Sequence, residues 1–167
     1  MAELKNEEKI VTMRLGIPEV MCDEIIGIHY IELPFLQSEV SEIISSFDEI
    51  GGDLALLFAA IQCTEDDRDL DLMVNHEESM IRMEVAKRGR EKDLIKLATD
   101  PDYGVRTVVA ESGNEQALNI LMNDERAGMR SYVTMYANLK QLEVLEHDPE
   151  IAVRYMARAC KRKLQQS

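Results

Sequence analysis

Four arginines recur at a fixed interval of 24 residues in the second half of the chain, and each follows an aliphatic residue. The arginines are Arg82, Arg106, Arg130 and Arg154, and the residues before them are Ile81, Val105, Met129 and Val153. A fixed period of this length is typical of stacked helical units, because one such unit buries too little apolar surface to be stable alone. Stacked units usually bind partners, so the period constrains the architecture more than the chemistry.

The same period includes apolar and acidic positions. Three residues after each arginine stands Val85, Val109, Val133 or Ala157. Paired leucines follow in the first three units: Leu94 with Leu97, Leu118 with Leu121, and Leu142 with Leu145. Three units open on an aspartate, Asp100, Asp124 or Asp148, and the earliest opens on His76. We therefore place repeats at 76–99, 100–123, 124–147 and 148–167.

Each unit has the signals of two short helices separated by a turn. Val105 and Val109 lie four residues apart, on one face of a first helix, and the paired leucines lie on one face of a second. Gly113 breaks the chain between them, since glycine tolerates left-handed backbone. Asp100 and Pro101 open the unit, because aspartate is a good N-cap and proline suits the first helical position.

The period also extends backward in a degraded form. The apolar pattern survives 24 residues before the first clear repeat, at Leu57, Phe58, Ile61, Leu70 and Met73, but the arginine does not. Atypical end units are expected as caps, because one face of a terminal repeat has no neighbour. We predict a degenerate first repeat at 51–75, an array covering 51–167, a helical N-terminal section at 1–50, and a single compact domain overall.

The repeat resembles the leucine-rich repeat variant, a HEAT-like family, over about residues 76–160. The stretch Asp100-Pro-Asp-Tyr-Gly-Val-Arg, followed by Val109-Ala110 and by Leu118 and Leu121, carries the resemblance. It implies a right-handed superhelix, which that family builds from alternating α and 3₁₀ segments. The Asn-Pro turn common in such repeats is missing, and no cysteine cluster for an iron–sulfur group is present. The expected fold is thus all-α, a right-handed helical-repeat solenoid after a helical N-terminal section.

The residues before position 55 are less regular. We predict a polar helix over 3–14 and a second helix over 18–30, although 28–35 could instead be extended. Ser38 could cap a third helix that runs through Phe47. Gly51 and Gly52 predict a turn, after which Asp53 opens an apolar helix.

Two interpretations fit an arginine in every unit. The periodic aspartates predict a structural ladder, in which Arg82, Arg106, Arg130 and Arg154 meet Asp100, Asp124 and Asp148 of the same or the next unit. The alternative is a row of arginines that grips phosphate or carboxylate groups. We favour the ladder, because the aspartates have the same period.

The net charge of −13 is unevenly placed. Residues 1–80 contain 19 acidic and 4 basic residues, whereas residues 81–167 contain 13 and 15. Nucleic-acid binding requires a basic footprint, so we expect no direct nucleic-acid contact. An acidic half instead favours a partner protein with a basic surface.

The acidic residues around position 70 are the main candidates for partner binding. They are Glu65, Asp66, Asp67, Asp69, Asp71, Glu77 and Glu78. The alternative is a solvated helix start, since acids favour the N-terminal dipole and Thr64 and Asp67 have capping-box spacing. A basic run at the other end, Arg158, Lys161, Arg162 and Lys163, could contact an acidic surface, although such tails are usually solvated.

No motif for catalysis, cofactor binding or metal binding is found in the sequence. The cysteines, Cys22, Cys63 and Cys160, are widely separated, and the histidines, His29, His76 and His147, lack ligand spacing. The chain has no glycine-rich phosphate loop and no nucleophile elbow. Tyr132, Tyr136 and Tyr155 could line a binding surface or pack between repeats. No run of about 18 apolar residues or secretory signal is present, so we expect a cytoplasmic protein without a membrane span.

The expected function is therefore a non-catalytic protein–protein interaction module, whose curved repeat surface and acidic N-terminal half dock a basic partner. The alternative is an acidic inhibitor of a DNA- or RNA-binding enzyme that mimics nucleic acid, as antirestriction proteins do. An enzyme such as a HEAT-like DNA glycosylase is disfavoured, because the charge is wrong and the chain has no tryptophan. Association into a homo-oligomer is left open.

Overall fold

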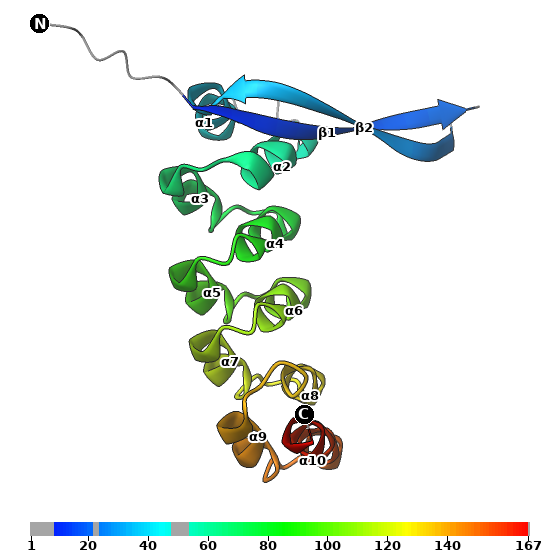
Figure 1. Ribbon diagram of the computed structural model, residues 1–167, viewed down its shortest axis with the longest axis vertical. Coiled ribbons are helices and arrows are strands. Elements are labelled where there is room, and N and C mark those ends of the chain that lie inside the picture. The colour runs from blue at the N-terminus through cyan, green and yellow to red at the C-terminus, as the bar shows by residue number, and fades with distance from the viewer. Residues whose placement is uncertain (1–8, 22–23, 48–53, 167) are drawn as a thin grey trace, which may run out of the picture. The chain divides into compact units, whose positions relative to one another are not determined.

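The computed structural model describes residues 9–21, 24–47 and 54–166, and these form ten helices and a two-stranded sheet (Figure 1). The chain divides into two compact units, Met1–Asn75 and His76–Ser167. We expected a single compact domain, but the backbone contacts separate these two parts. The boundary falls where the sequence places the first clear repeat.

The first unit begins with a long antiparallel hairpin. Strand β1 (Ile10–Met21) pairs with strand β2 (Glu24–Leu36), from Ile10 opposite Leu36 to Met21 opposite Glu24, with a bulge between Glu19 and Val20. The backbone N–H of Gln37 donates to the carbonyl of Lys9 at 2.9 Å and continues the pairing past the ends of the strands.

This hairpin corrects the all-α prediction, because the helices expected over 3–14 and 18–30 are strand at residues 10–14, 18–21 and 24–30. Residues 1–8 lie outside the described part of the chain. The alternative of extended backbone over 28–35 is what the structure shows. The physical reason is composition, since β-branched residues favour strands over helices: β1 contains two isoleucines and two valines, and β2 contains four isoleucines. Pro34 sits inside β2, where each strand of a two-stranded ribbon keeps one open edge.

Three helices complete the first unit: α1 (Gln37–Ser45), α2 (Leu54–Cys63) and α3 (Asp67–Met73). Helix α2 packs against β1, and α1 packs against α2, α3 and β2. The core joins the strand face to the helices through the fully buried side chains of Met13, Val40, Ile44, Leu57 and Ile61.

The start of α1 differs from the prediction in its cap. The helix is capped at Leu36, whose backbone N–H donates to the Glu39 carboxylate at 2.7 Å, so Ser38 lies inside the first turn. A glutamate at the third helical position can accept a hydrogen bond from the backbone N–H of the N-cap residue, so the helix can begin without a serine at the cap. The predicted turn at Gly51 and Gly52 and the predicted cap Asp53 lie outside the described residues.

The second unit consists of helices in two alternating sets. One set comprises α4 (Ser79–Lys87), α6 (Tyr103–Glu111), α8 (Ala127–Val133) and α10 (Ile151–Gln165). The other comprises α5 (Glu91–Leu97), α7 (Glu115–Leu121) and α9 (Leu139–Leu145). Within each set the helices begin 24 residues apart.

Figure 1 shows α4, α6 and α8 along one side of this unit and α5, α7 and α9 along the other. Helix α4 packs on α6, α6 on α8 and α8 on α10. The second set consists of seven-residue α-helices, which differs from the 3₁₀ segments implied by the family resemblance.

The periodic apolar residues form the core of the second unit. Each of these side chains is at most 2 % exposed: Ile81, Val85, Leu94, Leu97, Val105, Val109, Leu118, Leu121, Met129, Val133, Leu142, Leu145, Val153 and Ala157. Gly89 and Gly113 have φ of 74° and 68°, the left-handed conformation that ends α4 and α6. At the third such turn the residue is Ala137, and α8 ends two residues earlier than the register of α6 predicts.

Within the described residues, no helix is both long enough and apolar enough to cross a membrane.

Candidate functional site

Each of three periodic arginines holds an aspartate 18 residues further along the chain. The Nε atoms of Arg82, Arg106 and Arg130 donate to the carboxylates of Asp100, Asp124 and Asp148 at 2.7, 2.6 and 2.7 Å, respectively. Arg82 and Arg130 add a second bond from Nη2, at 2.9 and 3.0 Å. Two parallel bonds between guanidinium and carboxylate are the strong form of this interaction and fix its geometry.

The same guanidinium groups also bind the turn that opens their own unit. Nη1 of Arg106 donates to the carbonyl of Asp100 at 2.7 Å, and Nη1 of Arg130 donates to the carbonyl of Asp124 at 2.8 Å. Arg82 and Arg154 make the corresponding bonds to the carbonyls of His76 and Asp148, at 2.7 and 2.8 Å. Each of the first three arginines therefore links the opening turns of two successive units.

The aspartates fix the backbone at these turns. Their second carboxylate oxygen accepts the N–H two residues later, at 2.9 Å for Asp100, 2.8 Å for Asp124 and 2.8 Å for Asp148. Nδ1 of His76 accepts from the backbone N–H of Glu78 at 3.1 Å, so the His76 ring takes the place of the aspartate carboxylate in the earliest unit. The residue 24 positions before Arg82 is Phe58, so no periodic arginine precedes this turn.

Pairing changes the proton affinity of both partners. The hydrogen bond from Arg130 lowers the pKa of Asp148, and the same bond raises the pKa of Arg130. Asp100 likewise raises the pKa of Arg82. The side chains of these three aspartates are at most 5 % exposed, so both charges of each pair are largely withdrawn from water.

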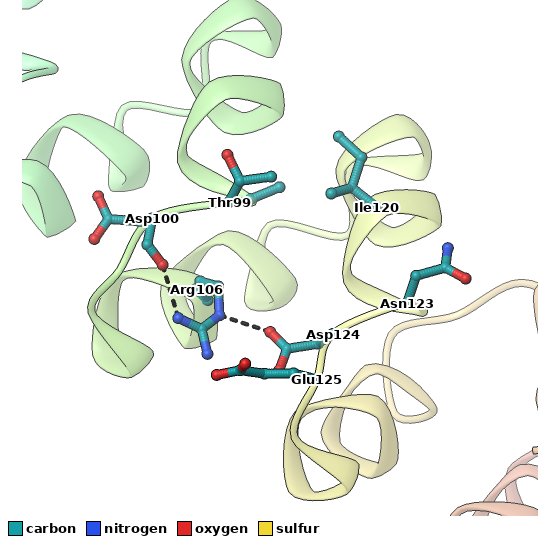
Figure 2. Close-up of a pocket in the computed structure, with 8 residues that line it drawn as sticks. Thr99, Asp100, Arg106, Ile120, Asn123, Asp124 and Glu125 are labelled. Atoms are coloured by element: carbon teal, nitrogen blue, oxygen red, sulfur yellow. Dashed lines mark hydrogen bonds and ion pairs between the residues drawn. The ribbon is translucent and has the colours of Figure 1, made fainter. Parts of the chain in front are cut away.

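A hollow of about 390 Å³ lies beside the middle pair (Figure 2). Its lining includes Ile120 and Asn123 together with the charged groups Arg106, Asp100, Asp124 and Glu125. Figure 2 shows that Arg106 is bound to Asp124 and to the Asp100 carbonyl rather than turned toward the open space. Nε of Arg106 is already bonded to the Asp124 carboxylate and Nη1 to the Asp100 carbonyl, which disfavours the alternative in which the arginines grip phosphate.

The predicted acidic residues do not form one exposed patch. Asp69 is only 4 % exposed and accepts hydrogen bonds from the hydroxyls of Ser41, at 2.8 Å, and Thr64. Asp66 caps α3 by accepting the N–H of Arg68 at 2.9 Å, and its carboxylate also pairs with the Arg68 guanidinium. Glu65 pairs with Lys9.

Glu65 and the other four residues are exposed, but they belong to different units. Asp67 and Asp71 lie four residues apart on α3 of the first unit. Glu77 and Glu78 precede α4 in the second unit. In the first unit, Glu32, Glu39 and Glu42 are also exposed.

The structural roles of Asp66 and Asp69 were missed, although the period contained a signal for both. Asp69 is in register with Asp93, Ala117 and Gln141, and all four are at most 4 % exposed. Asp66 is in register with Arg90, Asn114 and Asn138, the N-caps of α5, α7 and α9.

The basic run lies on α10. Lys161 pairs with Glu146 at 3.1 Å and with Glu143 at 3.5 Å, and these carboxylates raise its pKa. Arg158, Arg162 and Lys163 are exposed.

The tyrosines divide between packing and exposure. Tyr132 on α8 donates to Glu111 on α6 at 2.6 Å, and its ring lies 5.5 Å from that of Tyr136, so Tyr132 links two neighbouring helices. Tyr155 on α10 is 71 % exposed. Packing between helices thus holds for Tyr132, and a role of Tyr155 in a binding surface stays a prediction.

The remaining candidate ligands are scattered. Nδ1 of His147 lies 3.0 Å from the carbonyl of Glu143, and the half-buried thiol of Cys160 contacts the Thr134 hydroxyl at 3.8 Å. Cys63 is also half-buried, and Cys22 lies outside the described residues. Among residues 9–21, 24–47 and 54–166, no three side chains of metal-binding type come together.

Comparison of the chain with protein-family models, curated proteins and solved structures found no match in any of the three.

Proposed function

We propose that the chain is a non-catalytic binding protein, in which a right-handed helical solenoid similar to the leucine-rich repeat variant supports an acidic surface that docks a basic partner protein. The 24-residue register of the helices in the second unit supports the solenoid. The distribution of charge supports the docking surface, and it is the observation that carries the proposal.

Positive and negative charges are equal in number in the second unit, and part of them is used in stacking. Residues 76–167 contain 15 acidic and 15 basic residues. Three of these acids, Asp100, Asp124 and Asp148, are held by arginines of the ladder. A surface of mixed sign has little long-range attraction for either class of partner.

Charge in the first unit does not balance. Residues 1–75 contain 17 acidic and only 4 basic residues, which accounts for the whole net charge of −13. Asp67 and Asp71 on α3 and Glu39 and Glu42 on α1 are exposed, and these two helices contact one another. A surface of this kind raises the association rate with a basic partner, and salt weakens the attraction.

Affinity capture from a native lysate, followed by mass spectrometry, tests this proposal. The wild-type chain should capture a basic protein at low salt and lose it at high salt. The double variant Asp67→Lys/Asp71→Lys should lose the partner, because it reverses charge without touching the buried Asp69. The variant Glu125→Lys/Glu150→Lys makes the same change of charge at exposed positions of the second unit and should keep the partner. Equal capture by both double variants would contradict the proposal.

A second candidate is an inhibitor that mimics nucleic acid. The concentration of 17 acidic residues within 75 favours it, because carboxylates can occupy a phosphate-binding surface. The two candidates differ in one measurement. If the captured partner is a DNA- or RNA-binding enzyme, an inhibitor of this type competes with the nucleic acid for that enzyme, whereas an adaptor leaves its binding unchanged.

A further inference from the structure

The last periodic arginine, Arg154, makes the bonds to backbone carbonyls that the other three make, but not their bonds to a carboxylate. Its Nη1 donates to the carbonyls of Asp148 and Pro149 at 2.8 and 2.9 Å, as Arg106 does to Asp100 and Pro101. Among the described residues, no carboxylate bonds its Nε or Nη2. The group is thus held by its own unit in the orientation that binds an aspartate elsewhere in the ladder, and its carboxylate-binding edge is open.

The residues after Arg154 do not form the second helix that precedes the aspartate in the other units. There, the first helix ends near Gly89, Gly113 or Ala137, and a second helix leads to the aspartate. In α10 the corresponding residue is Lys161, and the helix continues to Gln165. At about 1.5 Å per residue, the chain leaves α10 roughly 16 Å beyond Arg154 along the helix axis.

The residue one turn further along α10 indicates the chemistry of what binds there. Earlier helices carry small buried residues at this position, Ala86, Ala110 and Thr134, each at most 1 % exposed. In α10 the residue is Arg158, which is exposed. A further unit of the same type would bury this charge without a partner, which is costly. A segment that offers a second carboxylate would instead pair with it.

Two exposed apolar side chains flank these arginines. Ile151 is 68 % exposed and Tyr155 is 71 % exposed, and they lie four residues apart beside Arg154 and Arg158. Exposed aromatic and arginine side chains are the types enriched at protein interfaces. The face therefore combines apolar area with two cations.

We propose that this face of α10, formed by Ile151, Arg154, Tyr155 and Arg158, binds an acidic segment of a separate polypeptide, one aspartate of which bonds the open edge of Arg154. This site takes a partner of the opposite charge to the one proposed for the first unit. The protein would thus bind a basic partner and an acidic one at different places, and each site can fail without the other.

A synthetic peptide tests the site directly. The probe is a labelled peptide with the sequence of residues 98–111, because its Asp100 is the aspartate that Arg82 binds in the chain itself. Fluorescence anisotropy at low salt should show saturable binding to the full chain. A peptide with Asp100→Asn should bind about tenfold more weakly or worse, since it lacks the charge-assisted pair.

Variants of the protein separate geometry from charge. Arg154→Gln should also weaken peptide binding about tenfold or more, and Arg154→Lys should fall between it and the wild type, because lysine keeps the charge but loses the planar pair of donors. Lys140→Gln, which removes an exposed charge from α9, should bind as the wild type does. Equal binding by the wild type and both Arg154 variants, or no saturable binding to any of them, overturns the proposal.

Two further measurements examine the open edge of Arg154 and the identity of its occupant. In an arginine Nε–H nuclear magnetic resonance spectrum, the signal of Arg154 should exchange with water faster than those of Arg82, Arg106 and Arg130, and should slow when the peptide is added. An Arg154 signal already protected in the free protein overturns the open edge. Self-association in sedimentation velocity that Arg154→Gln abolishes would make a second copy the occupant and overturn the separate polypeptide.

Discussion

The two units of this protein use aspartate in different ways. In the second unit, Asp100, Asp124 and Asp148 each meet an arginine of the preceding unit, and both side chains are largely buried. In the first unit, the buried carboxylate of Asp69 is held by the hydroxyls of Ser41 and Thr64. In the second unit each periodic aspartate is thus paired with a periodic arginine. In the first unit acidic residues outnumber basic ones, and several of them are exposed.

This difference has an energetic consequence. Removing one member of a buried ion pair leaves an uncompensated charge, so a single substitution in any arginine–aspartate pair of the ladder should lower the free energy of unfolding. An exposed ion pair contributes little, because water solvates both charges and salt screens them. The first unit should therefore tolerate changes in most of its acids, with Asp69 as the exception.

The largest effect should come from Arg106→Ala. Arg106 is 7 % exposed, and its loss leaves the Asp124 carboxylate, 5 % exposed, without its cation. We expect a loss of about 3–5 kcal/mol in the free energy of unfolding, typical of a broken buried pair. Urea unfolding followed by far-ultraviolet circular dichroism measures it.

The matched control for Arg106→Ala is Arg154→Ala. It removes the same bonds to backbone carbonyls but no bond to a carboxylate. The expected loss is about 1 kcal/mol, the net contribution of ordinary hydrogen bonds. Equal losses in the two variants would show that the bonds to the turn, and not the aspartates, stabilise the stacked units.

A smaller effect is expected from Asp69→Ala in the first unit. The substitution removes the carboxylate that accepts from the buried hydroxyl of Thr64 and from the hydroxyl of Ser41. We expect a loss of about 2 kcal/mol, in the range for an unsatisfied buried polar group. Urea unfolding of the same kind measures it.

Asp67→Ala is the control, since it removes an exposed acid from the same helix and should change stability by less than about 0.5 kcal/mol. If Asp69→Ala proves equally harmless, Asp69 is not a structural residue, and its place in the acidic docking surface must be reconsidered.

The period predicted the parts of the fold that depend on repeated burial. The positions of the buried leucines and valines follow from it, because helical spacing and apolar identity together decide which side chains lie inside. The same period also predicts that Asp69 is buried, because the residues at the equivalent position of the later units are buried. The chain-local sequence does not contain all of the partners of Asp69, because Thr64 lies five residues before it but Ser41 lies 28 residues before it.

The hairpin was harder to predict, for a physical reason. The segments over 10–21 and 24–36 have apolar residues at spacings compatible with either a helix or a strand. Pairing between the two strands selects the extended conformation over the helix. This pairing joins residues as far apart as Ile10 and Leu36, so the local propensity of either segment does not predict it. The start of α1 was uncertain for a different, local reason: Leu36 is the N-cap, with its N–H bonded to Glu39, and the expected cap Ser38 lies inside the first turn.

The last comparison is between a buried and an exposed arginine–aspartate pair, and the smallest effect is expected for the exposed one. Arg130 lowers the pKa of Asp148, and Arg68 lowers the pKa of Asp66, in each case through a side-chain hydrogen bond. A carboxylate whose folded pKa lies below its unfolded value, near 3.8, contributes stability above that value and loses the contribution as the pH falls through the folded pKa. The wild type should thus lose its advantage over Arg130→Gln as the pH is lowered below about 4.

Arg68→Gln provides the comparison, because the side chain of Arg68 is 87 % exposed. Its urea midpoint should match the wild-type midpoint at neutral pH and in acid, since solvent already screens the pair. Carbon-13 titration measures the pKa of the Asp148 and Asp66 carboxyl groups, and the urea midpoints measure the stability of the two variants at each pH. If Arg68→Gln destabilises the chain as much as Arg130→Gln does, burial does not explain why the ladder pairs matter, and the contrast between the two units loses its physical basis.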